Sequence, residues 1–256
     1  PRKVEVLDAC FALGDACGKV RDFEDCRRYL RRAKEGYEEQ LGPDSEKALE
    51  ATCCLIMSTD MGKGERIDKL RVLVGRIVRT LGEENLITLL ALSQLGSMLG
   101  DNREYDEARK VLERCLAGQE KVLGEDHKDT LMTVNNLGLL YNNLEDYEKA
   151  LECYERALKG SEKNLGKTHP QTLGIVMNIA VVYHVGLTDY GKAEELYDRA
   201  LEGYEAQLGK DHENSKTCAE NLAKCLAIAG EKLKFRKIID EYPHILKEAQ
   251  EAKNYI

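Results

Sequence analysis

Cysteine and histidine are the residues of this chain that could support redox or metal chemistry. The sequence has no Cys-x-x-Cys pair, and its nine cysteines lie at positions 10, 17, 26, 53, 54, 115, 153, 218 and 225. Zinc ribbons and redox motifs need that pair, because two thiolates must reach one metal or each other. Cys10 and Cys17, like Cys218 and Cys225, are seven residues apart, which is too far for a disulfide along one helix. We therefore expect reduced thiols that serve as small core residues in an intracellular protein.

Three histidines occur at one recurring position, Leu-Gly-x-x-His, and these are His127, His169 and His212. Residues on successive units of a helical repeat lie about 10 Å apart, too far to share a metal ion. We expect loop and cap hydrogen bonds from these rings instead. His184 has no recognisable Ser or Cys arrangement beside it, and no glycine-rich phosphate loop follows a strand. The sequence thus predicts no enzyme, no cofactor and no metal site.

Composition narrows the class of partner. The 256 residues are 43% hydrophobic and 33% charged, with a formal net charge of −8. This sign disfavours nucleic-acid binding, which needs a basic face, and no apolar run reaches the roughly 20 residues of a membrane helix. The N-terminus is broken by Glu5 and Asp8 and so is no secretory signal. We expect a cytoplasmic location, and the start at Pro1 without Met indicates an excerpt of a longer protein.

The chain repeats itself about every 42 residues. The segment LGEDHKDTLMTVNNLGLLYNNLEDYEKALECYERALKG begins at Leu123 and is followed at Leu165 by LGKTHPQTLGIVMNIAVVYHVGLTDYGKAEELYDRALEG. Each unit carries two apolar stripes of helical period. The predicted repeats are 1–40, 41–80, 81–122, 123–164, 165–207 and 208–242, in one domain over 1–256. Relative to the other repeats, one extra residue follows Tyr183 and two residues are missing from the second repeat. Both changes fall where we expect turns.

The repeated motifs also predict helix ends. The Gly of each Leu-Gly pair falls after the second helix, where a left-handed cap is needed. Thr130, Thr172 and Ser215 lie near the start of the first helix. Pro43 and Pro170 fall where a first-turn proline is tolerated.

The pattern LG…NNLG..Y….DY..A…Y.RAL resembles the tetratricopeptide repeat, and the period and the LGxDHxxT linker are most similar to the kinesin light chain type. The resemblance implies an all-α, right-handed superhelix of about six helix-turn-helix repeats, with a C-terminal capping helix at 244–256. It is strong in the third to fifth units and weak in the second, where GKGERIDKLRVLVGRIVRTL lacks the small-residue and aromatic marks.

In this family, first helices line a concave groove that binds polypeptides. The resemblance places the residue before the signature Leu in that groove, and it implies a peptide-binding set of Gln94, Asn135, Asn136, Asn142, Asn143, Asn178, His184 and Asn221. An amide both donates and accepts, so a ladder of amides can pair with an extended peptide backbone. The other interpretation is that the amides only fix neighbouring helices.

The predicted function is a non-catalytic protein-protein interaction module, and the alternative is a structural scaffold or self-association domain of a larger signalling or motor protein. By resemblance, the partners could include the kinesin heavy chain assembly or its cargo, with no nucleic acid and no membrane insertion. An apolar stripe on the outer helices would favour the alternative. The early groove carries Asp8, Asp15, Glu50 and Asp60, offset mainly by Lys19. We therefore expect a neutral-to-basic peptide.

Overall fold

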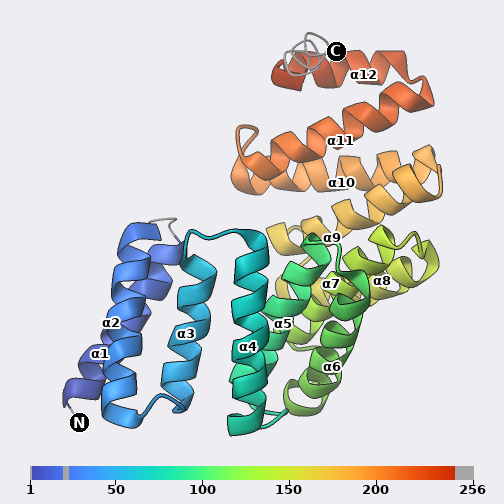
Figure 1. The fold of residues 1–256 in the computed structure, drawn as a ribbon. Coiled ribbons are helices and arrows are strands. Elements are labelled where there is room, and N and C mark those ends of the chain that lie inside the picture. Colours follow the sequence, from blue (N-terminus) through green and yellow to red (C-terminus); the bar gives the residue numbers. More distant parts are fainter. Residues whose placement is uncertain (1, 20–22, 246–256) are drawn as a thin grey trace. The chain divides into compact units, whose positions relative to one another are not determined.

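Helices alone make up the secondary structure of the described residues, 2–19 and 23–245, in the computed structural model (Figure 1). The first helices of the six repeats are α1 (Arg2–Lys19), α3 (Glu46–Ser58), α5 (Leu86–Asp101), α7 (Lys128–Asn143), α9 (Pro170–Val181) and α11 (Glu213–Ala229). The second helices are α2 (Phe23–Leu41), α4 (Lys63–Leu81), α6 (Tyr105–Leu123), α8 (Tyr147–Leu165), α10 (Tyr190–Leu208) and α12 (Lys232–Glu241). This confirms the all-α fold built of six helical pairs.

The chain forms two compact units, Pro1–Glu125 with α1 to α6 and Asp126–Ile256 with α7 to α12. Inside each unit, a second helix packs against the first helix of its own repeat and against that of the next. The single continuous domain over 1–256 stays a prediction. Among the described residues, no helix combines the length and the apolar character of a membrane span.

Close helix packing depends on small residues that face large ones. A Cβ atom added to Gly138 in α7 would lie 2.7 Å from the ring of Tyr154 in α8. One added to Gly160 in α8 would lie 2.5 Å from Leu131 in α7. Tyr154, Tyr197 and Tyr204 are among the largest fully buried side chains. The cores are therefore anchored by tyrosine as well as by the aliphatic residues.

Each second helix except α12 is followed by a glycine whose backbone conformation other residues rarely adopt. Gly82, Gly124, Gly166 and Gly209 have φ between 84° and 93° with ψ between 162° and 172°. This region of positive φ and extended ψ is nearly exclusive to glycine. The predicted glycine at these helix ends is confirmed, but its conformation is extended rather than the left-handed helical one.

The helix starts differ in part from the prediction. Pro170 is the first residue of α9, as predicted, whereas Pro43 lies in the turn before α3, whose N-cap is Ser45. The N-caps of α7, α9 and α11 are histidines rather than the hydroxyl residues three positions later. Ser215 is buried instead, and its hydroxyl donates to the carbonyl of Gly209 over 2.8 Å.

The extra residue of the fifth repeat lies inside a helix and not in a turn. The end of the first helix widens into a π-helical turn, Val182–Gly186. Such a turn accommodates one added residue while the rest of the helix keeps its packing. The predicted capping helix at 244–256 begins with His244 and Ile245 in helical conformation, and its remainder lies outside the described residues.

Candidate functional site

The three linker histidines cap helices. In His127, His169 and His212, the ring Nδ1 accepts a hydrogen bond from the backbone N–H two residues later, over 3.2, 3.2 and 3.1 Å. Each ring satisfies a donor of the first helical turn that would otherwise lack a partner. This confirms the predicted cap role. No cluster of three or more metal-ligating side chains occurs within the described residues.

The cysteines are free thiols, and most of them are buried in the cores. Cys115 Sγ, for example, donates to the carbonyl of Leu89 over 3.2 Å. Burial raises the pKa of Cys153 and of Cys225 to about 11, which keeps these thiols protonated and weakly nucleophilic. The predicted role of the thiols as small core residues is confirmed.

Three of the predicted groove amides, Gln94, Asn135 and Asn178, take part in hydrogen bonds between neighbouring first helices. The Asn178 side chain in α9 donates to Asn135 Oδ1 in α7 over 3.2 Å. At the equivalent place in the first unit, Cys53 Sγ in α3 donates to Gln94 Oε1 in α5 over 3.0 Å. The two bonds are equivalent when positions are counted from the signature apolar residue of each first helix. Each bond links the residue two positions before it in one repeat with the residue one position before it in the next repeat. Gln94 and Asn178 therefore tie first helices together.

Asn221 in α11 occupies the same position as Gln94 and Asn178 but has a different neighbour. Met177 stands in α9 where α7 has Asn135, so no amide faces it across the helices. The amides of Asn136, Asn142 and Asn221 are half-buried, and that of Asn143 is exposed. Within the described part of the chain, none of these four amides forms a hydrogen bond with another side chain or a backbone group. These four amides are free to pair with a ligand.

His184 is a packed residue. Its side chain is 8% exposed, and its ring makes edge contacts with Tyr190 and Tyr197 at centroid distances of 6.0 and 6.1 Å. The Tyr197 hydroxyl lies 3.5 Å from His184 Nδ1. Burial, and secondly the charge of Lys224, lower the pKa of His184. The ring is thus neutral at pH 7, and its predicted contact with a ligand remains untested.

Exposed apolar side chains form the part of the first-helix surface that sequence reasoning missed. In the second unit, Met132 and Leu139 of α7 are 48% and 40% exposed, Val185 of the π-helical turn is 65% exposed, and Ile228 of α11 is 63% exposed. Met132 and Leu139 are seven residues apart, so they share one face of α7. That face lies outside the stripe formed by Leu131, Val134 and Leu137. The signal was present in the sequence as apolar residues out of phase with the core stripe.

The acidic first-helix surface of the first unit is partly neutralised by a residue other than the predicted Lys19. Asp8 in α1 accepts hydrogen bonds of 2.6 Å from Lys47 Nζ in α3 and from the Tyr37 hydroxyl in α2. The bond from Lys47 is the main cause of the lowered pKa of Asp8. Glu50 has a raised pKa, caused first by burial and then by the nearby carboxylate of Glu46. The side chain of Lys19 lies outside the described residues.

Comparison with known proteins agrees with this repeat architecture. The tetratricopeptide repeat family profile matches residues 87–163, 129–184 and 171–234, which together span more than half of the chain. No curated protein matches the sequence.

Three solved structures illustrate the likeness of fold. A protein from Podosopora anserina, described as a kinesin light chain with nearly identical TPR-like repeats, has a TM-score of 0.62 at 19% identity, over 88% of this chain and 96% of that one. BtubC (BKLC) from P. vanneervenii has a TM-score of 0.68 at 22% identity, over 81% and 83%. A Rap protein in complex with competence and sporulation factor has a TM-score of 0.63 at 14% identity, over 94% and 75%. Tetratricopeptide repeats are in general non-catalytic protein-interaction modules. Together with the helical pairs and their small-residue contacts, the profile match shows that this chain belongs to the tetratricopeptide repeat family.

Proposed function

We propose that this chain is a non-catalytic module that holds an extended segment of a partner protein on the first-helix surface of its second unit. The observation that supports this is the combination of free amides and exposed apolar side chains on α7, the π-helical turn and α11. Asn136 and Asn221 would pair with the ligand backbone. Met132, Leu139 and Val185 would contact its apolar side chains.

The apolar residues modify the expected ligand. The amides and acidic residues alone predict a neutral-to-basic peptide, whereas the exposed Met132 and Leu139 favour one that also carries aliphatic or aromatic side chains. The resemblance to kinesin light chains makes a cargo protein of a motor complex one candidate partner. The alternative function, self-association, predicts an apolar stripe on the second helices. In the second unit, the exposed large apolar side chains of the second helices are Leu165 at the end of α8 and Leu233 in α12.

Selection of random extended peptides on the 256-residue chain tests the proposal. The double substitution Asn136→Ala with Asn221→Ala should weaken binding of a selected peptide by about tenfold, since each lost hydrogen bond contributes on the order of 1 kcal/mol. The melting temperature should stay nearly unchanged, because neither amide forms a hydrogen bond with another group in the described part of the chain. Gln207→Ala, at an exposed position of α10, is the control and should bind normally.

Three results would contradict the proposal. The first is failure to select any peptide, and the second is binding that the double substitution does not weaken. The third is a concentration-dependent dimer that competes with the peptide, which would favour self-association instead.

A further inference from the structure

The first helix of the chain, α1, exposes an apolar face. Its residues Val6, Ala9, Ala12, Leu13 and Ala16 are all exposed, Val6 by 52% and Leu13 by 48%. The spacing of three and four residues places Val6, Ala9, Leu13 and Ala16 in one row along about 15 Å of helix, with Ala12 beside it. Two large aliphatic side chains and two alanines therefore face solvent along one side of α1.

The same face is covered by a helix in the later repeats. When positions are counted from Gly14 in α1 and from the equivalent Gly96 in α5, Val6 corresponds to Thr88 and Leu13 to Leu95. Thr88 and Leu95 are 0% and 2% exposed, and α5 packs against the preceding second helix, α4. The corresponding residues of α9 and α11 are buried as well, and these are Thr172, Ile179, Ser215 and Leu222. The row on α1 is thus continuous with the surface on which this fold stacks one helix on another.

Val6 distinguishes the face of α1 from its counterparts. At this position α5, α9 and α11 have a hydroxyl residue that bonds to the preceding repeat over 2.6 to 2.8 Å: Thr88 to the Gly82 carbonyl, Ser215 to the Gly209 carbonyl and Thr172 to the Ser161 hydroxyl. In α3 the position is Ala48, which is smaller. Val6 has the size of threonine without its hydroxyl, so under a preceding repeat it would leave a carbonyl of the linker without that bond. The face of α1 therefore suits a helix that is apolar at every point of contact.

The order of large and small residues along the row is self-complementary. The row reads large, small, large, small from Val6 to Ala16. When two copies of α1 pack antiparallel about a two-fold axis at position 11, Val6 of one copy lies against Ala16 of the other, and Leu13 lies against Ala9. A parallel pair would place alanine against alanine and leave gaps between the helices at those layers. The small Ala12, next to the axis, lets the two helices approach closely.

We propose that the exposed face of α1 is a self-association site, at which two copies of this chain form an antiparallel helix pair. One 18-residue helix per copy supplies the contact, so the buried area lies at or below the roughly 1,200 Å² at which stable complexes begin. The dimer is therefore weak and depends on concentration. The site belongs to the first unit and uses none of the residues of the peptide surface proposed for the second unit, so the two proposals stand or fall separately.

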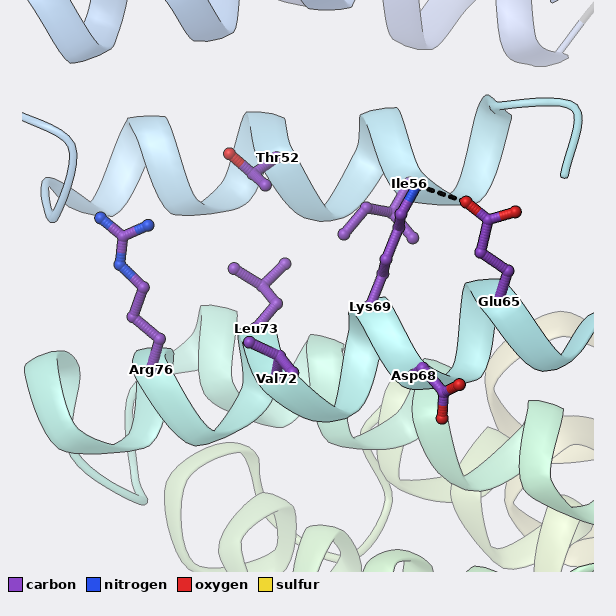
Figure 2. A pocket seen from close by; sticks show the side chains of 8 residues that line it. All are labelled: Thr52, Ile56, Glu65, Asp68, Lys69, Val72, Leu73 and Arg76. Carbon is purple, nitrogen blue, oxygen red and sulfur yellow. Dashed lines mark ion pairs between the residues drawn. The ribbon is translucent and has the colours of Figure 1, made fainter.

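Sedimentation velocity of the 256-residue chain, from micromolar to near-millimolar concentration, tests this inference. The monomer should give way to a dimer as the concentration rises. Leu13→Glu should weaken the dimer by tenfold or more, because its carboxylate would be buried against Ala9 of the other copy without a partner. The matched control is Val72→Glu on α4, a position 74% exposed that lines the groove between α3 and α4 (Figure 2). This control should leave the dimer unchanged, and circular dichroism should show that both variants stay helical.

The packing order has its own readout. Ala9→Leu adds apolar surface, yet it should weaken the dimer several-fold, because the added side chain would meet Leu13 of the other copy. The double substitution Ala9→Leu with Leu13→Ala exchanges large and small residues and should recover most of the association. A chain that stays monomeric at every concentration would overturn the proposal, and so would a dimer that Leu13→Glu leaves intact. Stronger association with Ala9→Leu, or an equal loss with Val72→Glu, would also overturn it, because the contact would then be unspecific or lie elsewhere.

Discussion

The second and fourth repeats have the same two-helix plan but differ in how closely their helices approach. In the fourth repeat, Gly138 and Gly160 let α7 and α8 pack until Tyr154 is 1% exposed. In the second, Ile56 and Arg76 occupy the equivalent positions, and a groove separates α3 from α4. Apolar periodicity is sufficient to form the helices of both repeats. The distance between them is set by the volume of a few residues at the crossing point.

Polar links accompany the looser packing of the second repeat. Arg66 Nη2 donates to the carbonyl of Thr59 over 2.7 Å, which fixes the turn between α3 and α4. Arg71 bonds to Glu107 of α6 over 2.9 Å through two nitrogens. A bidentate pair holds orientation well but is too exposed to stabilise as much as a buried contact does. The helix α4 beside the groove is thus held mainly by polar bonds to the turn before it and to α6 of the next repeat, and less by packing against α3.

The largest expected difference concerns loss of a core side chain. Tyr154→Ala should destabilise the second unit by about 4 kcal/mol, since it leaves a closed cavity, whereas Leu73→Ala should cost about 2 kcal/mol because its site borders an open groove. Urea denaturation, with hydrogen exchange to assign each transition to a unit, measures both. Equal costs would show that the α3–α4 pair is as tightly packed as α7–α8.

A smaller effect should come from adding one methyl group at a glycine. Gly138→Ala should destabilise the protein by about 2 kcal/mol, because the new carbon would lie 2.7 Å from the Tyr154 ring. Gly75→Ala in α4 meets no atom within 4 Å and should stabilise by about 0.5–1 kcal/mol, the gain in helix propensity. Thermal unfolding of the two variants gives shifts of opposite sign. Destabilisation by Gly75→Ala would mean that α4 packs on something at that face.

The smallest effect concerns pH, and His184 and Glu50 should contribute to it with opposite signs. All five histidines lie in the second unit. The buried His184 has a lowered pKa, so the unfolded chain binds the proton more readily and stability falls as pH drops through about 6.5. Glu50 in the first unit has a raised pKa, so the folded state binds the proton more readily and stability rises as pH falls toward that pKa.

Hydrogen exchange at pH 7.5 and 5.5, corrected for intrinsic exchange rates, measures the pH effect in each unit. Protection of α9 and α10 should decrease at the lower pH, and His184→Asn should remove most of that decrease. His212→Asn, which keeps a capping side chain, is the control and should preserve the decrease. A loss of protection that is equal in both units would contradict the assignment to His184.

The repeated features were the ones that could be predicted from the sequence. The helix pairs, the cap role of His127 and the glycine after each second helix follow from local patterns, which depend on residues within one or two turns. The conformation of those glycines was predicted less well, because their ψ depends on the direction in which the next helix leaves. The extra residue near Tyr183 was assigned to a turn, because no sequence pattern distinguishes a turn insertion from a π-helical one.

At the candidate site, local sequence patterns do not predict which partner an amide bonds to. Gln94, Asn178 and Asn221 share one repeat position and were predicted to share one role. Two of them bond to side chains of the preceding first helix, whereas for Asn221 the equivalent position of that helix is Met177, which has no amide. The partner of each amide is more than 40 residues away in sequence, so its chemistry follows from the stacking of the repeats.

The helices and the family follow from the sequence alone, because hydrogen bonding along a helix and apolar periodicity are local and recur in every repeat. The fold was needed to show which amides are free, that His184 is packed between two tyrosines, and that a groove lies between α3 and α4. The missing small residues of the second repeat were visible in the sequence as a departure from the motif. Their consequence needed the structure, because whether a large side chain fills a space or opens one depends on what the opposite helix presents.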